Sequence, residues 1–360
     1  MRPANALDRR PVVVAGVGET GPRPEDPRSI PEMVLEAVTE ALADARLGYG
    51  DIDAVVTASV DLFDGLTASN IAVTEVVGAV MRPETRIAGD GLAAALHAAC
   101  QIWAGAYDTV LVAAHGKASM SCYQDLTRWA LDPILVQPLG LDFLACSGLQ
   151  ASAMAVADPG AERRWAETAA VRRAACATDA ASPCTAEAVL ESAVAAAPIR
   201  EGMCAPMADG ATAVVLRTVA PAGNGEDVRL AGVGCDLDRH ALGDRDLCAW
   251  RGLERAAERA YAGAGVADPE DAFDLAEPSC RCAHEEELFL AATGVGAGTL
   301  VSPSGGLFAG DVPVAAGLSR LVAAVRHMRG DAGCRRALAH GAWGPAGQAH
   351  VVAVLDRGTA

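Results

Sequence analysis

Two segments of this 360-residue chain repeat one pattern, a helix-like stretch followed by a short acidic turn. The first copy is Glu36–Leu47 (EAVTEALADARL), followed by Asp51-Ile52-Asp53. The second begins 218 residues later as Glu254–Val266 (ERAAERAYAGAGV), followed by Asp268-Pro269-Glu270. Further on, GDGLAAALHAACQIWAG and SGGLFAGDVPVAAGLSRLVAAVRHMRG each join a glycine turn to an apolar helix that ends in glycine. Chance similarity in alanine-rich sequence is the alternative, but the pattern favours a duplicated unit with a site between its halves.

Strand and helix patterns alternate along the first copy. A short apolar strand (PVVVAGVGET) precedes a predicted helix over Pro31–Ala45, where apolar residues recur at helical spacing. A strand is predicted at Ile52–Val60, an alanine-rich helix at Gly91–Ala104 and another strand at Asp108–Ala114. This alternation predicts an α/β protein.

The chain divides into two parts of unequal regularity. We expect an N-terminal half over residues 1–219 and a C-terminal half over 226–360. The first half contains a loop excursion at about 117–200, in which polar and proline-containing stretches separate helical segments. A strand at Ala211–Leu216 closes this half, and a linker with glycine and proline, Ala220–Asp227, leads to a strand at Val228–Gly234.

Composition excludes several classes of protein. A net charge of −17 argues against nucleic-acid binding, which depends on clustered lysine and arginine. No apolar run approaches the roughly 20 residues of a membrane span, and the N-terminus lacks the apolar region of a signal peptide. Eleven cysteines in so long a chain do not form a disulfide framework, so we expect free thiols and a cytoplasmic location.

Five segments in order resemble the thiolase superfamily, particularly its bacterial and archaeal lipid-transfer-protein-type members. They are VVVAGVGET, GAYDTVLVAAHGKASMS, APMADGATAVVL, SPSGGLFAG and ALAHGAWGPAGQAHVVAVL. The resemblance spans nearly the whole chain, and PMADGATAVVL and SPSGG are its more specific parts.

The resemblance implies a thiolase fold, in which duplicated αβαβα halves form a five-layer core, and a homodimer joined through the first half. It implies acyl-CoA thioester substrates, no separate cofactor, and in this branch a small zinc-ribbon/OB-fold partner protein. The family's reaction is Claisen condensation or its reverse, through a cysteine at a helix N-terminus. Such a position lowers the pKa of a thiol and favours the nucleophilic thiolate.

The sequence departs from the family at the catalytic positions. Alignment of RIAGDGL places Ala88 where the family has its cysteine, and alanine cannot form a thioester. In the family's Gly-His-Pro turn, this chain reads Gly310-Asp311-Val312-Pro313. Ala276-Glu277-Pro278-Ser279 replaces Asn-Glu-Ala-Phe, and the loop of the catalytic base reads His340-Gly341-Ala342-Trp343-Gly344.

Three residues are our candidates for catalysis: His340, Asp311 and Asp90. A neutral imidazole suits a general base near pH 7, although His340 could equally support its turn. Asp311 and Asp90 lie on matching glycine turns and could form a carboxylate pair for acid–base work. Each could instead cap its helix, a position that aspartate favours.

Ser304, Gly305 and Gly306 are our candidates for binding the coenzyme A thioester, because glycine allows backbone to approach a ligand closely. A simple tight turn is the alternative. Four arginines of the excursion either contribute to coenzyme A binding, as the family implies, or lie on a solvated helix surface: Arg163, Arg164, Arg172 and Arg173.

Cysteines give two weaker signals. On a strand, Cys280, Cys282 and His284 would share one face and could bind zinc, but no fourth ligand is evident, so no metal site is predicted. His284 precedes an acidic run, 285–287, that we expect to begin a solvated helix. Cys146, in CSGLQ, resembles a nucleophile signature, but it follows the strand at Asp108–Ala114 that the family's cysteine precedes, so we interpret it as a buried helix cysteine.

Three functions compete. The first is an acyl-CoA enzyme that makes or breaks a carbon–carbon bond without a cysteine nucleophile, for which a retro-aldol lyase fits best. The second is a non-catalytic acyl-binding or scaffold subunit in a complex with the zinc-ribbon/OB-fold partner. The third is ordinary thiolase activity through another cysteine, Cys100 or Cys146.

Overall fold

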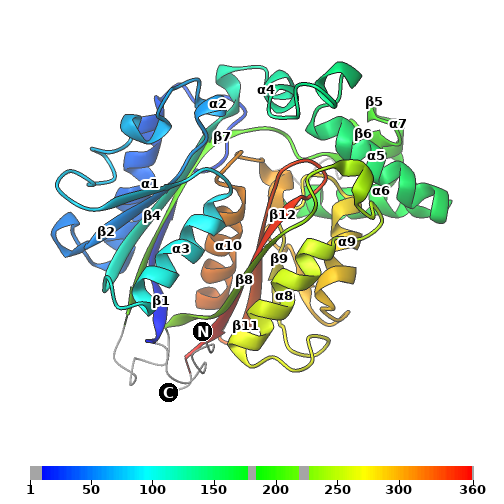
Figure 1. Cartoon of the computed structure of the whole chain (residues 1–360). Coiled ribbons are helices and arrows are strands. Elements are labelled where there is room, and N and C mark those ends of the chain that lie inside the picture. The colour runs from blue at the N-terminus through cyan, green and yellow to red at the C-terminus, as the bar shows by residue number, and fades with distance from the viewer. Residues whose placement is uncertain (1–9, 177–183, 219–226, 359–360) are drawn as a thin grey trace.

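The computed structural model describes residues 10–176, 184–218 and 227–358, so only Asp227 of the predicted linker is described. Ten strands form one mixed sheet in the order β10-β9-β11-β12-β8-β1-β7-β4-β2-β3 (Figure 1). The order is symmetric about its centre, because β1 and β8 meet in the middle and β3 and β10 end the two arms. One residue pair, Val13 with Arg229, joins β1 to β8, so two five-stranded arms of the sheet meet at a narrow contact.

The two halves use the same elements in the same order. In the first half these are β1 (Val12–Glu19), α1 (Ile30–Ala45), β2 (Ala54–Ala58), α2 (Asp61–Asp64), β3 (Glu84–Ile87), α3 (Gly91–Trp103), β4 (Thr109–Lys117) and β7 (Asp209–Thr218). In the second they are β8 (Val228–Leu237), α8 (Arg251–Ala264), β9 (Leu275–Glu277), α9 (His284–Thr293), β10 (Leu300–Val301), α10 (Ala316–Gly330), β11 (Arg336–Trp343) and β12 (Ala349–Arg357). Short 3₁₀ turns are η2 (Tyr49–Asp51), η3 (Ser69–Ala72), η7 (Leu242–Asp244) and η8 (Gly306–Ala309).

Helices and sheet arms alternate in five layers. The helices α3 and α10 lie between the two arms, and their apolar residues share one core cluster with strands of both (Figure 1). On the outer face of the first arm lies α1, and α8 and α9 cover the outer face of the second. The duplicated αβαβα halves and the five-layer core predicted from the sequence are therefore confirmed.

Glycines on β1 and β8 let helices approach the sheet at equivalent places. The tetrapeptide Ala-Gly-Val-Gly occurs at 15–18 and again at 231–234. A Cβ on Gly18 would lie 2.1 Å from the carbonyl oxygen of Ala37 in α1, and one on Gly234 would lie 1.9 Å from that of Ala256 in α8. This tetrapeptide is a further repeat shared by the two halves.

The excursion between β4 and β7 is largely helical. It comprises η4 (Ala118–Met120), α4 (Tyr123–Trp129), η5 (Gln137–Leu139), α5 (Phe143–Ala157), α6 (Ala161–Cys176), α7 (Ala186–Glu191), β5 (Val194–Ala196), β6 (Ile199–Arg200) and η6 (Glu201–Met203). Trp165 of α6 is fully buried in a cluster that also contains Phe308 and Ala283 of the second half. The excursion thus packs against the C-terminal half. Within the described residues, no helix combines the length and apolar character needed to cross a membrane.

Candidate active site

Two cavities share the segment that follows η8 as part of their walls. Gly310 and Val312 line the first cavity, which has a volume of about 380 Å³. Asp311, between them in the chain, lines the second, which has a volume of about 420 Å³. Of the predicted site residues, Ser304 lines the first cavity and Asp311 lines the second.

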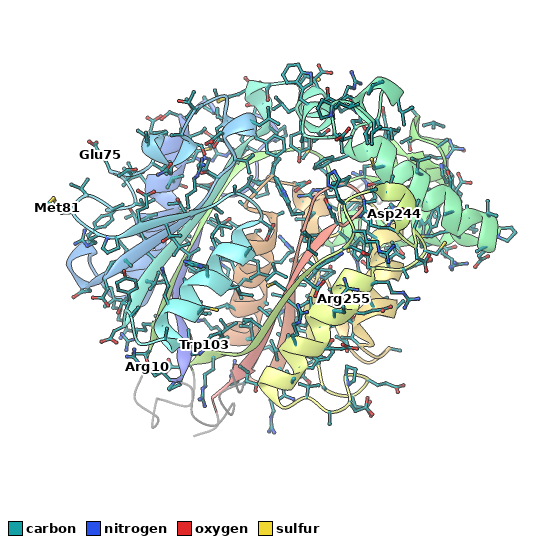
Figure 2. The ribbon with its side chains drawn as sticks, in the orientation of Figure 1. Arg10, Glu75, Met81, Trp103, Asp244 and Arg255 are labelled. Carbon is teal, nitrogen blue, oxygen red and sulfur yellow. The ribbon has the colours of Figure 1, made fainter. Side chains whose placement is uncertain are left out.

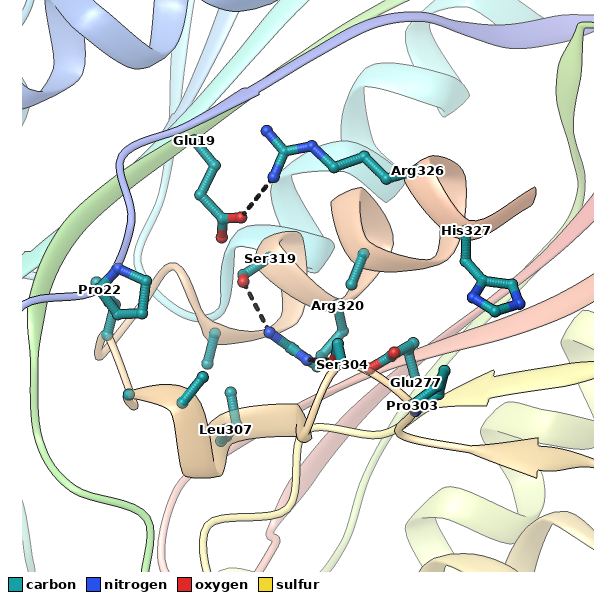
Figure 3. A pocket seen from close by; sticks show the side chains of 15 residues that line it. Glu19, Pro22, Glu277, Pro303, Ser304, Leu307, Ser319, Arg320, Arg326 and His327 are labelled. Carbon is teal, nitrogen blue, oxygen red and sulfur yellow. Dashed lines mark hydrogen bonds and ion pairs between the residues drawn. The ribbon is translucent and has the colours of Figure 1, made fainter. Parts of the chain in front are cut away.

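The first cavity lies beside α10 and contains a buried ion pair (Figure 3). Arg320 Nη1 donates to Glu277 Oε2 at 3.0 Å, and both side chains are buried. Ser304 donates its hydroxyl to the same carboxylate oxygen at 3.0 Å and accepts a bond from Arg320 Nη1 at 2.9 Å. The polar atom of Ser304 is therefore already satisfied within the protein.

Gly305 and Gly306 form a tight turn with φ of +83° and +61°. A Cβ on Gly305 would lie 2.8 Å from the Cβ of Cys176 and 2.9 Å from the carbonyl oxygen of Arg172. Gly305 thus allows the end of α6 to approach the turn. Of the three predicted thioester-binding residues, Ser304 is the one that lines the cavity.

The second cavity lies where the excursion meets the loops of the C-terminal half. Its polar lining includes Tyr123, Arg281, Glu285 and Asp311. Its apolar lining includes Phe143, Leu144, Met207 and Trp250. A concave, mostly apolar pocket with a few convergent polar groups is the usual form of a small-molecule site.

Arg281 and Asp311 form an ion pair in this cavity. Arg281 Nε donates to Asp311 Oδ2 at 2.7 Å, and the Asp311 side chain is 1% exposed while that of Arg281 is 21% exposed. Burial opposes the charge of Arg281, but the nearby charge of Asp311 holds the pKa of the guanidinium above its ordinary value. The backbone of Asp311 is fixed by bonds to Pro206 and Ala208. Asp311 does not cap α10, which begins at Ala316.

Glu285, in the first turn of α9, is a second buried carboxyl in the cavity wall. Its Oε2 accepts from the backbone N–H of Arg281 at 2.6 Å and of Cys282 at 3.3 Å. Burial raises the pKa of Glu285 to about 7, against the opposing effects of Arg281 and these two bonds. The expectation that residues 285–287 begin a solvated helix is wrong for Glu285, because it shares a face with the buried Leu288 and Phe289.

Tyr123 of α4 brings a phenol to the same wall. Burial raises the pKa of Tyr123 to about 12, and the charges of Arg281 and Asp311 also act on it. Its ring contacts Phe63 with centroids 5.2 Å apart. Near neutral pH this hydroxyl is a neutral hydrogen-bond donor.

Asp90 caps α3 and also holds α10. Its Oδ1 accepts from the N–H of Leu92 at 2.8 Å, and its Oδ2 accepts from the N–H of Gly317 at 2.9 Å. Burial raises the pKa of Asp90 to about 6, and the charges of Arg281 and Asp311 reach it with opposite effects. The helix-capping alternative therefore describes Asp90, although it lies close enough to the Arg281–Asp311 pair to interact with it.

His340 is not brought together with the other two candidates. It is fully buried on β11, where Nε2 is 3.0 Å from His350 Nδ1 and Nδ1 accepts from the N–H of Ser279 at 3.4 Å. Its ring contacts Trp250 and Phe289, on the outer side of the sheet. Burial lowers the pKa of His340 well below its ordinary value, so the imidazole is neutral. His340 is absent from the linings of both cavities.

Comparison with known proteins identifies the fold of the chain. No protein-family model and no curated protein sequence matches the chain. Among solved structures, the Ltp2-ChsH2(DUF35) aldolase superposes with a TM-score of 0.79 and 19% identity over 96% of this chain and 98% of that one. Human mitochondrial 3-ketoacyl-CoA thiolase gives 0.77 and 16% identity over 99% and 100%. The chain has the thiolase fold.

A third structure with the thiolase fold is the monomeric SCP2-thiolase like protein type 1 from Mycobacterium smegmatis. It superposes with a TM-score of 0.75 and 21% identity, over 98% of this chain and 78% of that one.

In this thiolase fold, the residue expected at the cysteine position lies at the surface. Ala88 is exposed in the bend after β3, two residues before the Asp90 cap. Cys146 is buried in α5, where burial raises the pKa of its thiol to about 11. Cys100 is exposed in the C-terminal part of α3, away from the helix N-terminus.

The excursion's arginines are engaged within the protein. Arg172 forms a two-pronged ion pair with Glu286, at 2.7 and 2.8 Å. Arg164 pairs with Glu287 at 3.0 Å. Arg173 donates to backbone carbonyls, including that of Gly202 at 2.8 Å. These contacts join α6 to α9 and to η6.

Cys280, Cys282 and His284 do not converge. Cys280 and Cys282 lie in the loop after β9 and His284 begins α9, so the alternation expected of a strand does not apply. His284 Nε2 lies 3.2 Å from the side-chain oxygen of Gln150. Within residues 10–176, 184–218 and 227–358, no group of three or more His, Cys, Asp or Glu side chains could hold a metal ion.

Sequence reasoning missed Arg281, Glu285 and Tyr123. For Glu285 a signal was present, because positions 285, 288 and 289 lie on one face of a helix. Arg281 and Tyr123 carried no such signal, since only the tertiary structure brings α4 beside the start of α9.

Proposed function

We propose that this protein acts on acyl-CoA thioesters and makes or breaks a carbon–carbon bond by acid–base chemistry, without a cysteine nucleophile. A retro-aldol cleavage of a β-hydroxyacyl-CoA is the form that we favour. The observation that carries the proposal is the buried group of Arg281, Asp311 and Glu285 in the 420 Å³ cavity. Ala88 at the expected cysteine position supports the absence of a thioester intermediate.

The charges in the cavity divide the two carboxyls into different roles. Asp311 is in direct contact with the guanidinium of Arg281, at 2.7 Å, and is its ion-pair partner. Glu285 accepts from backbone N–H groups instead, and burial raises its pKa to about 7 although the charge of Arg281 opposes this shift. Carboxyl groups in different surroundings can take different roles in an acid–base site.

The proposed reaction uses these groups in order. Ionised Glu285 accepts the proton of the substrate's β-hydroxyl, the bond between the α and β carbons breaks, and a carbonyl product forms. The bonding electrons pass into the thioester, giving an enolate whose oxygen is stabilised by donors from Arg281 and Tyr123. The enolate carbon then takes a proton, which yields the shortened acyl-CoA and returns Glu285 to its ionised form. Asp311 orients the guanidinium.

Turnover of a β-hydroxyacyl-CoA tests this proposal. Glu285→Gln is expected to lower kcat by about 10²- to 10⁴-fold, the usual contribution of a general base. Asp311→Asn is expected to lower it as well, by freeing Arg281. The matched control is Glu286→Gln, which removes a neighbouring carboxylate that lies outside the cavity lining and should retain most activity. If Glu285→Gln turns over like the unaltered protein, the acid–base assignment is wrong.

Mass spectrometry after incubation with acetyl-CoA tests whether the protein lacks a cysteine nucleophile. We expect no acyl group on any cysteine. An acylated cysteine would instead establish the third hypothesis, thiolase chemistry through a thiol at another position.

The alternative function is an acyl-binding subunit of a complex with a zinc-ribbon/OB-fold partner. It is favoured by exposed large apolar side chains in the excursion, namely Met120, Trp129, Ile134, Leu135 and Leu139. The name of one structural neighbour, the Ltp2-ChsH2(DUF35) aldolase, also joins two protein names. Acyl-CoA binding by the isolated chain without turnover would favour this alternative. We retain the cytoplasm as the proposed compartment.

A further inference from the structure

Two cysteines face each other across a short antiparallel bridge in the wall of the second cavity. Cys204, just before β7, pairs with Cys282, at the start of α9. The flanking residues make the hydrogen bonds, since Ala205 donates to Arg281 at 2.7 Å and Ala283 donates to Met203 at 2.9 Å. The cysteines are therefore a non-hydrogen-bonded pair, a position in which the Cα atoms of the two strands are typically about 4.5 Å apart.

That geometry fits a disulfide. Disulfides span Cα separations of about 4.4 to 6.8 Å, so the backbone needs no large movement. The two Sγ atoms already lie 3.7 Å apart. Both residues line the cavity, and they differ in access, because Cys204 is half-buried while Cys282 is only 3% exposed.

We propose that Cys204 and Cys282 form a reversible dithiol–disulfide pair that is oxidised by a peroxide or by a small-molecule disulfide. With hydrogen peroxide, the Cys204 thiolate attacks one oxygen, the O–O bond breaks, and the departing hydroxide takes a proton to leave as water. Cys282 then attacks the resulting sulfenic sulfur, forming the S–S bond and releasing a second water. Two thiols and one peroxide thus give one disulfide and two waters.

The disulfide would change the candidate active site directly. It would join the segment before β7 to the residue that follows Arg281 in the chain. Ala205 and Met207 on one side, and Arg281 and Glu285 on the other, line the same cavity. Oxidation would therefore fix the backbone that carries the guanidinium, and reduction would release it. The proposal does not depend on the reaction assigned above.

Peptide mapping tests the pair independently of any activity. Cleavage after arginine and lysine gives peptides 201–217 and 282–320, each with a single cysteine. After treatment of the folded protein with peroxide and alkylation of remaining thiols, we expect these peptides to be joined and lighter by two hydrogen atoms. Dithiothreitol should separate them. Glutathione disulfide in place of peroxide should give the same joined peptides.

Cysteine variants test which two thiols form the disulfide. Cys204→Ser should abolish the joined peptide, and Cys282→Ser should do the same if it folds. Cys248→Ser, an exposed position outside both cavities, should leave it unchanged. Unjoined peptides after complete oxidation of the exposed thiols would overturn the proposal. So would a peroxide product in which Cys204 is over-oxidised or linked to a different cysteine.

Discussion

At the scale of single residues, the buried carboxyl groups determine how the protein responds to pH. Asp311 has its counter-charge in Arg281. Asp90 has two backbone donors, and burial still raises its pKa to about 6. Glu285 faces Arg281, Asp311, Cys280 and Cys282, and burial raises its pKa to about 7. The folded state therefore favours the protonated form of Glu285.

This gives a prediction for stability. A folded-state pKa above the ordinary value stabilises the fold at low pH, and that contribution is lost as pH rises from about 4.5 to about 7. Glu285→Gln mimics the protonated form, so its free energy of unfolding should fall less over this range, by about 3 kcal/mol. Urea unfolding at several pH values measures the difference. The control is Glu258→Gln, at an exposed position on α8, which should follow the unaltered protein. The same dependence of the unfolding free energy on pH in all three proteins would contradict the assignment.

The sequence was least informative about the contacts of single residues. The acidic character of position 311 and the capping tendency of position 90 could be predicted from the residue types. The partner of Asp311 could not, because Arg281 lies 30 positions earlier and belongs to a loop without a periodic pattern. His340 was placed in the catalytic loop by resemblance, whereas strand alternation turns its side chain toward Trp250 and Phe289.

At the scale of elements, close contact between a strand and the helix that covers it depends on glycine in the strand. The same tetrapeptide lies on β1 and β8, and in both places a Cβ would fall on a carbonyl oxygen of the helix. Neither helix can move away from the sheet without exposing apolar side chains, because α1 and α8 each contribute buried residues to a core cluster.

Gly234→Ala tests this packing. The added Cβ would lie 1.9 Å from the carbonyl oxygen of Ala256, so α8 must shift and the unfolding free energy should fall by about 3 kcal/mol. The matched control is Gly243→Ala, where a Cβ has nothing within 4 Å and the change should stay within about 0.5 kcal/mol. Denaturant unfolding distinguishes the two. Equal stability of both variants would mean that α8 is not held against β8 at this distance.

The elements of the repeat were the best predicted part of the chain. The helix expected at Pro31–Ala45 is α1 at Ile30–Ala45, and the one expected at Gly91–Ala104 is α3 at Gly91–Trp103. Their apolar residues recur at a helical period because one face of each lies against the sheet. The helices of the excursion lack this periodic pattern, because α5 and α6 pack against several short segments rather than one sheet.

At the scale of the whole molecule, the duplication explains both what could be predicted and what could not. Two equivalent halves could be expected from the repeat, and the five layers from the resemblance to the thiolase superfamily. The cavity could not, because it is formed by features that break the symmetry. Tyr123 and Phe143 come from the excursion, which only the first half has, and Arg281 and Asp311 come from loops of the second.

Of the two edge strands of the sheet, β3 and β10, the first lies beside exposed apolar side chains. In the described part of the chain, β3 is paired on one side only, by β2. Beside it lie exposed apolar side chains, with Ile71 71%, Val80 56% and Met81 98% exposed. Figure 2 shows Met81 pointing away from the body of the protein at this end. The resemblance to the thiolase superfamily implies a homodimer joined through the first half, so a second copy of the chain is the partner that we expect at this end.

We therefore predict a homodimer of the 36.7 kDa chain, joined at the β3 end. Sedimentation velocity should give twice the chain mass, and the double change Ile71→Glu and Met81→Glu should weaken association by about 10²-fold or more, because two apolar side chains would lose their burial. Val171→Glu, at another exposed apolar position on α6, should leave the mass unchanged. A monomer at every concentration would mean that the exposed β3 end belongs to a different partner or to none.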